Sequence, residues 1–182
     1  MIPARAAWAG LLVVAGCAQV PPSGDLGPAL SGRLSVRVQA STERPAQSQS
    51  AAFEWRGNAL RGELRLFTPL GTQAALASWA PGEVRLLTSE GQFRFQSLED
   101  LAQQTLGERL PLLAWADWLA GRPWPGASAQ ALAEGVGFSQ LGWTVDLSRR
   151  PEGRISARRE QPPAVQVLIV LDAEAAAAGP LQ

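Results

Sequence analysis

The 182 residues are enough for one domain with a substantial core, and 46% hydrophobic against 18% charged residues is a globular composition. Sixteen arginines balance sixteen Asp and Glu residues, and lysine is absent, so the net charge gives no reason to expect nucleic acid as a partner. The absence of histidine removes the usual general base and the usual metal ligand. We therefore expect no enzyme, no metal and no cofactor.

Residues 1–16 have the features of a cleaved secretory leader. Arg5 precedes an uncharged, largely apolar run over residues 6–16, close to the roughly 7–15 residues of a secretory apolar region and short of the about 20 needed to span a bilayer. The run closes with Val14-Ala15-Gly16-Cys17, which resembles the bacterial lipobox, in which the cysteine is lipidated. An ordinary leader with an incidental cysteine is the alternative. We predict that Cys17 is a lipid-attachment site.

The rest of the chain divides by composition. Residues 17–29 contain several Pro and Gly residues and are predicted to be a flexible tether that follows the lipidated cysteine. A folded domain is predicted over residues 30–172, where regular hydrophobic patterns begin and end. Residues 173–182 are rich in alanine and are predicted to be a frayed tail.

Alternation of apolar and polar residues predicts antiparallel strands, each with one buried face. Such alternation is followed by turn residues at Gly57-Asn58, Pro81-Gly82 and Glu90-Gly91, a spacing typical of successive hairpins. The inward residues of the expected strands are Leu34, Val36, Val38, Phe53, Trp55, Leu64, Leu66, Val84, Leu86, Phe93 and Phe95, and after the helices Trp143, Val145, Leu147 and residues 165–171. The sequence therefore predicts a curved sheet that is completed late in the chain.

Two helices are predicted between these strands. Ser97 can cap the first, whose apolar residues recur at helical spacing up to Gly107. The second is predicted from Pro111 to Ala120, and Gly121 stops it. Its broad apolar face consists of Leu112, Trp115, Trp118 and Leu119.

Together these elements predict a mainly β fold with α-helices, an incomplete antiparallel β-barrel whose helices cover the concave side. The space beneath the helices can be a filled core or an open cavity, and periodicity does not decide between the two. Six of the seven tryptophans fall in this small domain, which favours a lined cavity, because such large rings are hard to pack densely against one another.

Several motifs, in order, resemble the LolB family of outer-membrane lipoproteins over about residues 32 to 147. The family's first three strands are represented by Gly32-Arg33-Leu34-Ser35-Val36, Phe53-Glu54-Trp55 and Leu66-Phe67-Thr68-Pro69-Leu70-Gly71. Its helical segment is represented by Leu106-Gly107, Leu110-Pro111, Trp118-Leu119, Gly121 and Pro123, and its return strand by Phe138, Gln140 and Gly142-Trp143.

The resemblance implies an apolar cavity under a helical lid that holds the acyl chains of a lipoprotein. We assign to the cavity and lid Trp55, Leu64, Leu66, Trp79, Trp115, Trp118, Leu119 and Trp143. The implied partners are the periplasmic carrier LolA, acylated lipoproteins and outer-membrane lipid. Ala18 stands where an aspartate would resemble an inner-membrane retention signal, so we expect the protein to be anchored in the outer membrane, facing the periplasm. We also expect it to be a monomer.

The loop with Pro69, Leu70 and Gly71 is a separate candidate site. Pro suits the second position of a type I turn and Gly the fourth, which places Leu70 near the apex, facing water. The alternatives are a leucine folded back onto its own hairpin and a scattered exposed leucine of no consequence. The resemblance implies that this loop is a membrane-inserting tip.

Two other functions compete with lipoprotein transfer. The first is a structural or adaptor lipoprotein that binds a protein partner through the same sheet, with the tryptophans as core. The second is a cell-wall hydrolase that uses a pair of carboxylates, with Glu99, Asp100 and Asp117 as candidates. We disfavour the hydrolase, because these acids lie where a helix cap and a solvated helix face would place them.

Overall fold

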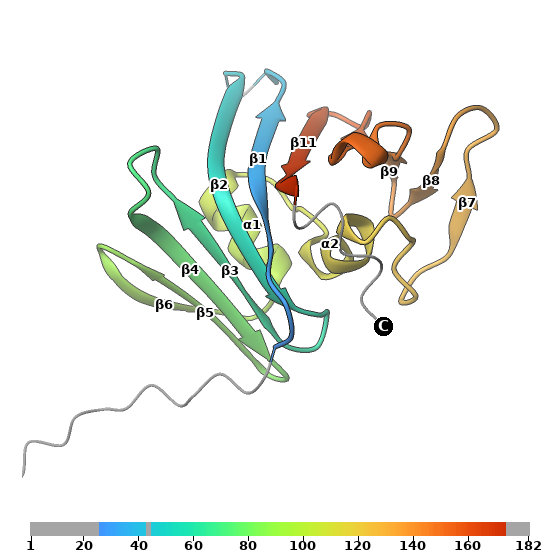
Figure 1. Ribbon diagram of the computed structural model, residues 1–182. Helices are drawn as coiled ribbons and strands as arrows, with labels where there is room; N and C mark the ends of the chain where they lie inside the picture. Colours follow the sequence, from blue (N-terminus) through green and yellow to red (C-terminus); the bar gives the residue numbers. More distant parts are fainter. Residues whose placement is uncertain (1–25, 43–44, 174–182) are drawn as a thin grey trace, which may run out of the picture.

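The computed structural model describes residues 26–42 and 45–173, which form one curved sheet of eleven strands with two helices against its concave side (Figure 1). The predicted leader, Cys17, most of the predicted tether and nearly all of the predicted tail lie outside the described residues. All the strand pairs are antiparallel. The prediction of an open antiparallel sheet with helices is confirmed.

The sheet is built from two halves of the chain. Its strand order is β6-β5-β4-β3-β2-β1-β11-β10-β9-β8-β7, so the six strands before the helices and the five after them join where β1 pairs with β11. The strands are β1 (Leu30–Val38), β2 (Gln47–Gly57), β3 (Gly62–Phe67), β4 (Gln73–Ala80), β5 (Glu83–Thr88), β6 (Gly91–Phe95), β7 (Ala129–Ala131), β8 (Gly137–Gln140), β9 (Trp143–Asp146), β10 (Arg154–Arg159) and β11 (Val165–Leu171). The expected completion of the sheet after the helices is thus confirmed.

Alternation did not predict β4 or β10. Both strands carry alanine at inward positions, Ala75 and Ala77 in β4 and Ala157 in β10, and alanine gives a weak hydrophobic signal. Both strands lie inside the sheet and not at its edges, so their pairing with neighbours on either side compensates for the weak pattern.

The helices α1 (Leu98–Leu106) and α2 (Leu112–Leu119) begin and end as the sequence predicts, within a residue. The hydroxyl of Ser97 accepts a hydrogen bond of 3.0 Å from the backbone N–H of Asp100, so the predicted cap is present. Gly107 ends α1 in the left-handed region, with a φ of 76°, where glycine avoids the penalty of a Cβ. Figure 1 shows both helices behind the sheet, between its two halves.

The core under α2 is densely packed with aromatic rings. Trp118 lies 6.3 Å, between ring centroids, from both Phe138 and Trp143, and these three side chains are 3 to 4% exposed. In the half of the sheet that precedes the helices, the ring centroids of Trp55 and Trp79 are 4.8 Å apart. These tilted and edge-to-face pairs are the arrangements that aromatic rings prefer, so this part of the concave side is filled.

A buried amide fixes the segment that follows α2. Gln140, 2% exposed, accepts hydrogen bonds from the indole N–H of Trp118 at 2.8 Å and the backbone N–H of Trp124 at 2.9 Å. Its own NH₂ group donates to the carbonyl oxygens of Trp124 and Ala127 at 2.7 and 2.8 Å. The side chain is therefore fully satisfied, and it ties the loop after α2 to β8.

We expect Gln140→Leu to destabilise the fold by about 2 to 5 kcal/mol, because the change preserves volume but leaves several buried polar groups without partners, each costing about 1 to 3 kcal/mol. Chemical denaturation of the purified protein measures the effect. Gln130→Leu on β7, where the side chain is exposed, is the control and should change the free energy of unfolding by less than about 0.5 kcal/mol. Equal effects of the two changes would contradict this account of Gln140.

Candidate functional site

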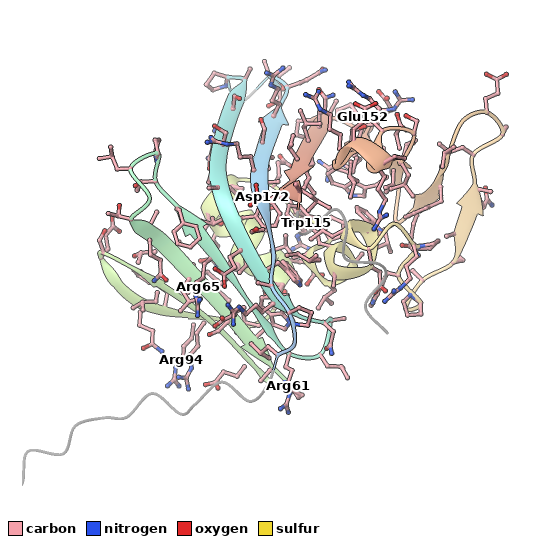
Figure 2. All side chains as sticks on the ribbon, in the orientation of Figure 1. Arg61, Arg65, Arg94, Trp115, Glu152 and Asp172 are labelled. Carbon is pink, nitrogen blue, oxygen red and sulfur yellow. The ribbon has the colours of Figure 1, made fainter. Side chains whose placement is uncertain are left out.

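An apolar cavity of about 280 Å³ lies between α1 and the concave face of β1 to β5. We call it the inner cavity. Leu34, Leu64, Leu66 and Leu86 line it from the strands, and Leu101, Ala102 and Leu106 line it from α1. Leu112 and Trp115 of α2 close one end. Figure 2 shows Trp115 in the interior between the sheet and the helices.

Small residues leave this space open. In the sheet, Ala51 pairs with Leu34, Ala77 with Leu64 and Ala75 with Leu66, so each leucine on the wall faces an alanine across the strands. An alanine side chain ends at its Cβ, and the helix above contributes another small residue, Ala102. The cavity is therefore a direct result of alanine at positions where neighbouring sheet regions carry tryptophan or phenylalanine.

Polar side chains mark the open end of the inner cavity. The side chains of Gln49 and Thr105 belong to its lining and are exposed, whereas the alanines and leucines deeper in are buried or half-buried. The hydroxyl of Thr105 donates a 2.8 Å hydrogen bond to the carbonyl oxygen of Leu101, so it presents its methyl group and not a free donor. The interior thus offers apolar surface with few polar groups.

The residues that we assigned to the cavity and lid fall into two groups. Leu64, Leu66 and Trp115 line the inner cavity. The others are absent from its wall: Trp118 and Trp143 belong to the aromatic cluster with Phe138, Trp55 packs on Trp79, and Leu119 is 1% exposed beside Trp55. The structure therefore separates a packed tryptophan core from a cavity bordered by leucine and alanine.

Sequence reasoning missed most of the cavity wall. The sequence did not lead us to assign Ala51, Ala75 and Ala77 on the strands, or Leu101 and Ala102 on α1, to the cavity. The available signal was alanine at two successive inward positions of β4, Ala75 and Ala77, combined with the helical spacing of Leu101 and Leu106. We assigned tryptophans to the cavity wall because they are large. Large side chains fill space, however, and small ones leave it open.

The loop between β3 and β4 stands beside the open end of the inner cavity. The wall pair Leu66 and Ala75 is the last regular pair of the two strands before residues 68–72. The backbone N–H of Gly71 donates to the carbonyl oxygen of Thr68 at 2.9 Å, which is the hydrogen bond of the predicted turn. The prediction that Leu70 faces water is confirmed, because its exposed fraction is 91%.

An ion pair connects the segment between the helices to the far half of the sheet. Arg159 of β10 donates to the Glu108 carboxylate at 2.9 Å and to the carbonyl oxygen of Pro163 at 3.1 Å, and its guanidinium carbon lies 5.6 Å from the centre of the Trp143 ring. Glu108 is 6% exposed. This bridge fixes the end of α1 relative to the packed tryptophan core.

The acids considered for a hydrolase have local structural roles. The carboxylate of Asp117 pairs with Arg122 at 2.8 Å, and Glu99 and Asp100 lie in the first turn of α1, where negative charge stabilises a helix. Among residues 26–42 and 45–173, no group of three or more Cys, Asp or Glu could hold a metal ion. None of the described helices is long and apolar enough to cross a membrane.

Comparison with known proteins gives a consistent result. The model of the family described as "Outer membrane lipoprotein LolB" matches residues 29–167. The outer-membrane lipoprotein LolB of Bordetella petrii is 33% identical over 163 residues, which cover 82% of this chain and 81% of the relative. The proteins of the same name from Chromobacterium violaceum and Azoarcus sp. are 31% and 30% identical, covering 76% and 85% of this chain and 78% and 86% of those relatives.

Proposed function

Because this chain belongs to the LolB family of outer-membrane lipoproteins, we propose that it receives acylated lipoproteins from the periplasmic carrier LolA and inserts them into the outer membrane. In this proposal the protein is a monomer, anchored through lipidated Cys17 and facing the periplasm. The inner cavity holds acyl chains during the transfer. No step is catalytic.

The inner cavity is the observation that supports this proposal. An acyl chain in water costs about 0.8 kcal/mol for each exposed CH₂ group, so a triacylated protein needs shelter throughout its transfer. A wall of leucine and alanine provides apolar surface and no buried group that would have to lose a hydrogen bond. A cavity of this kind favours a chain of methylenes and disfavours polar ligands.

We propose α1 as the main movable cover of the cavity. The resting volume of about 280 Å³ lies just below the roughly 300 to 1,000 Å³ of ordinary ligand pockets, so the chains of a lipoprotein would require the cavity to widen. Helix α1 contributes more of the wall than α2, whose Trp118 and Leu119 are held in the packed core. Outward movement of α1 would enlarge the cavity while Trp118 and Leu119 stay in the packed core, and α1 would pivot at its C-terminal end, which the Glu108–Arg159 ion pair holds.

Transfer in a purified mixture tests the proposed function. The full chain in detergent is mixed with LolA that carries a radiolabelled lipoprotein, and the two proteins are then separated. We expect the label to move to this chain without nucleotide, since the chain would need only a higher affinity for the acyl group. If the label stays on LolA while a fluorescent fatty acid also fails to bind, the receptor function is excluded and the adaptor alternative is favoured.

We predict that Cys17 serves only to anchor the protein. Replacing Cys17 by Ser behind a cleavable secretory leader should give a periplasmic protein that still accepts lipoprotein from LolA, because the thiol has no part in moving a lipid. Fractionation and the same transfer assay measure the two properties. The wild-type protein is the control, and loss of acceptance by a folded Cys17→Ser protein would contradict the prediction.

A further inference from the structure

A second depression, of about 520 Å³, lies on the convex face of the sheet beside the loop with Leu70. We call it the outer groove. Phe67 and Pro69 border it on the loop side, and Leu168 and Val170 of β11 border it on the other. Arg33, Ser35 and Ser50 lie between these apolar borders. The proposed transfer of acyl chains makes no use of this surface.

Strand register shows how the outer groove is assembled. Phe67, Ala52, Arg33 and Val170 are direct neighbours across β3, β2, β1 and β11, and they form one row. The next row contains Ser50, Ser35 and Leu168. Val167 and Ile169 of β11 are buried on the concave side, so Leu168 and Val170 must point to the convex side. Leu168 is accordingly 38% exposed.

Arg33 is the only charged residue that lines the outer groove in the described part of the chain. Its side chain is exposed and forms no ion pair with any described residue, whereas Arg65 on the same face pairs with Glu54 and Glu63. Figure 2 shows Arg61, Arg65 and Arg94 lower on the molecule than the β3–β4 loop. An unpaired guanidinium beside serine hydroxyls is suited to bind an anion with several oxygen acceptors.

We propose that the outer groove binds the phosphate of an anionic phospholipid of the membrane, with Arg33 and the hydroxyls of Ser35 and Ser50 on its oxygens. The glycerol end of the lipid lies against Phe67 and Leu168. The inference rests on the proposed insertion of lipoproteins into the outer membrane and on the membrane-inserting role that the family resemblance implies for the loop with Leu70. It adds that the protein recognises a headgroup as well as the hydrocarbon, and that this recognition sets the orientation of the cavity mouth.

The relative positions of Leu70 and Arg33 fit contact with the hydrocarbon and with the phosphates at the same time. Arg33 is two strands away from Phe67, or roughly 10 Å at the usual spacing of strands, and Leu70 lies beyond Phe67 in the loop. Apolar side chains of surface-bound proteins enter the boundary between headgroups and acyl chains by roughly 5 to 10 Å. The row that holds Phe67 and Arg33 lies behind the tip of the loop, so Arg33 is set back from the hydrocarbon toward the phosphates when Leu70 is inserted.

A fluorophore at position 70 reports the contact. The full lipidated chain with Leu70→Cys, labelled with an environment-sensitive apolar dye, is reconstituted at fixed density into phosphatidylcholine vesicles with increasing phosphatidylglycerol. We expect the emission to shift to the blue as the anionic lipid increases. We then introduce Arg33→Gln into the labelled protein. The phosphatidylglycerol fraction that gives half of the maximal shift should rise about fivefold, as expected for loss of one arginine at an anionic surface.

Arg37→Gln is the matched control. Arg37 is exposed on the same strand and the same face, but it lies outside the outer groove. A second pair of variants leaves both arginines in place: Ala52→Glu puts a carboxylate opposite Arg33, and Ser48→Glu puts one opposite Arg37. We expect Ala52→Glu to act like Arg33→Gln, and both controls to stay within twofold of the parent. Circular dichroism verifies that each variant is folded.

The outcomes separate the two proposals. If Arg33→Gln and Arg37→Gln raise the required phosphatidylglycerol fraction equally, diffuse surface charge replaces the phosphate site as the explanation. If Arg33→Gln does not change this fraction, the phosphate site is overturned. In both cases the blue shift itself would still support the membrane contact of Leu70. A dye that stays in water in every vesicle would overturn the membrane contact of Leu70 and the phosphate site with it.

Discussion

Leu70→Glu should accept lipoprotein from LolA at the normal rate and insert it into membranes at least tenfold more slowly. Leu70 is 91% exposed and its turn is closed by backbone bonds, so the fold does not depend on the side chain. Burial of one leucine in a bilayer contributes about 1.5 to 3 kcal/mol, which is enough to orient a protein but not to anchor it. A carboxylate at that position would oppose insertion. Liposomes and a label on the lipoprotein follow both steps in one assay.

Leu60 provides a matched control for this experiment. It is also a turn leucine, 74% exposed, but it lies in the loop between β2 and β3, at the opposite end of β3 from Leu70. Leu60→Glu adds the same charge to a similar exposed site, so it should leave both acceptance and insertion unchanged. Normal insertion by Leu70→Glu, or an equal defect in Leu60→Glu, would show that the loop has no special role in delivery.

Ala75→Phe should abolish most acyl-chain binding. Ala75 lines the inner cavity opposite Leu66, and a phenyl ring at this position would occupy the space that a chain needs. We expect the affinity for a fluorescent fatty acid to fall at least tenfold, together with acceptance from LolA. The free energy of unfolding should stay within about 2 kcal/mol of the wild type or rise, because filling a cavity commonly stabilises a protein. Fluorescence titration and chemical denaturation measure the two effects.

Ala74→Phe is the control for the blocked cavity. Ala74 is the neighbouring residue, it is exposed, and it is absent from the wall of the inner cavity. The same ring is thereby added to the same strand without entering the cavity, and binding should be unchanged. If Ala75→Phe is folded and binds the fatty acid as tightly as the wild type, the inner cavity is not the acyl-chain site.

Local patterns in the sequence determined most of the elements. Alternation at Leu34, Val36 and Val38 predicted β1, and Ser97 and Gly107 predicted both ends of α1. The Thr68 to Gly71 turn and the exposure of Leu70 also followed from the sequence, because each depends on residues adjacent in the chain. Such features need no knowledge of distant contacts. The family resemblance added the expected function and an ordered set of motifs to these local predictions.

Only the tertiary structure decided which part of the concave side is filled and which is open. Periodicity says that a side chain points inward, but not what stands opposite to it. The pairing of β3 with β4 sets Ala77 against Leu64 and leaves space, whereas α2 brings Trp118 against Phe138 and Trp143 and removes it. Void volume depends on the sizes of residues that are far apart in sequence and meet only on folding, so the cavity had to be found in three dimensions.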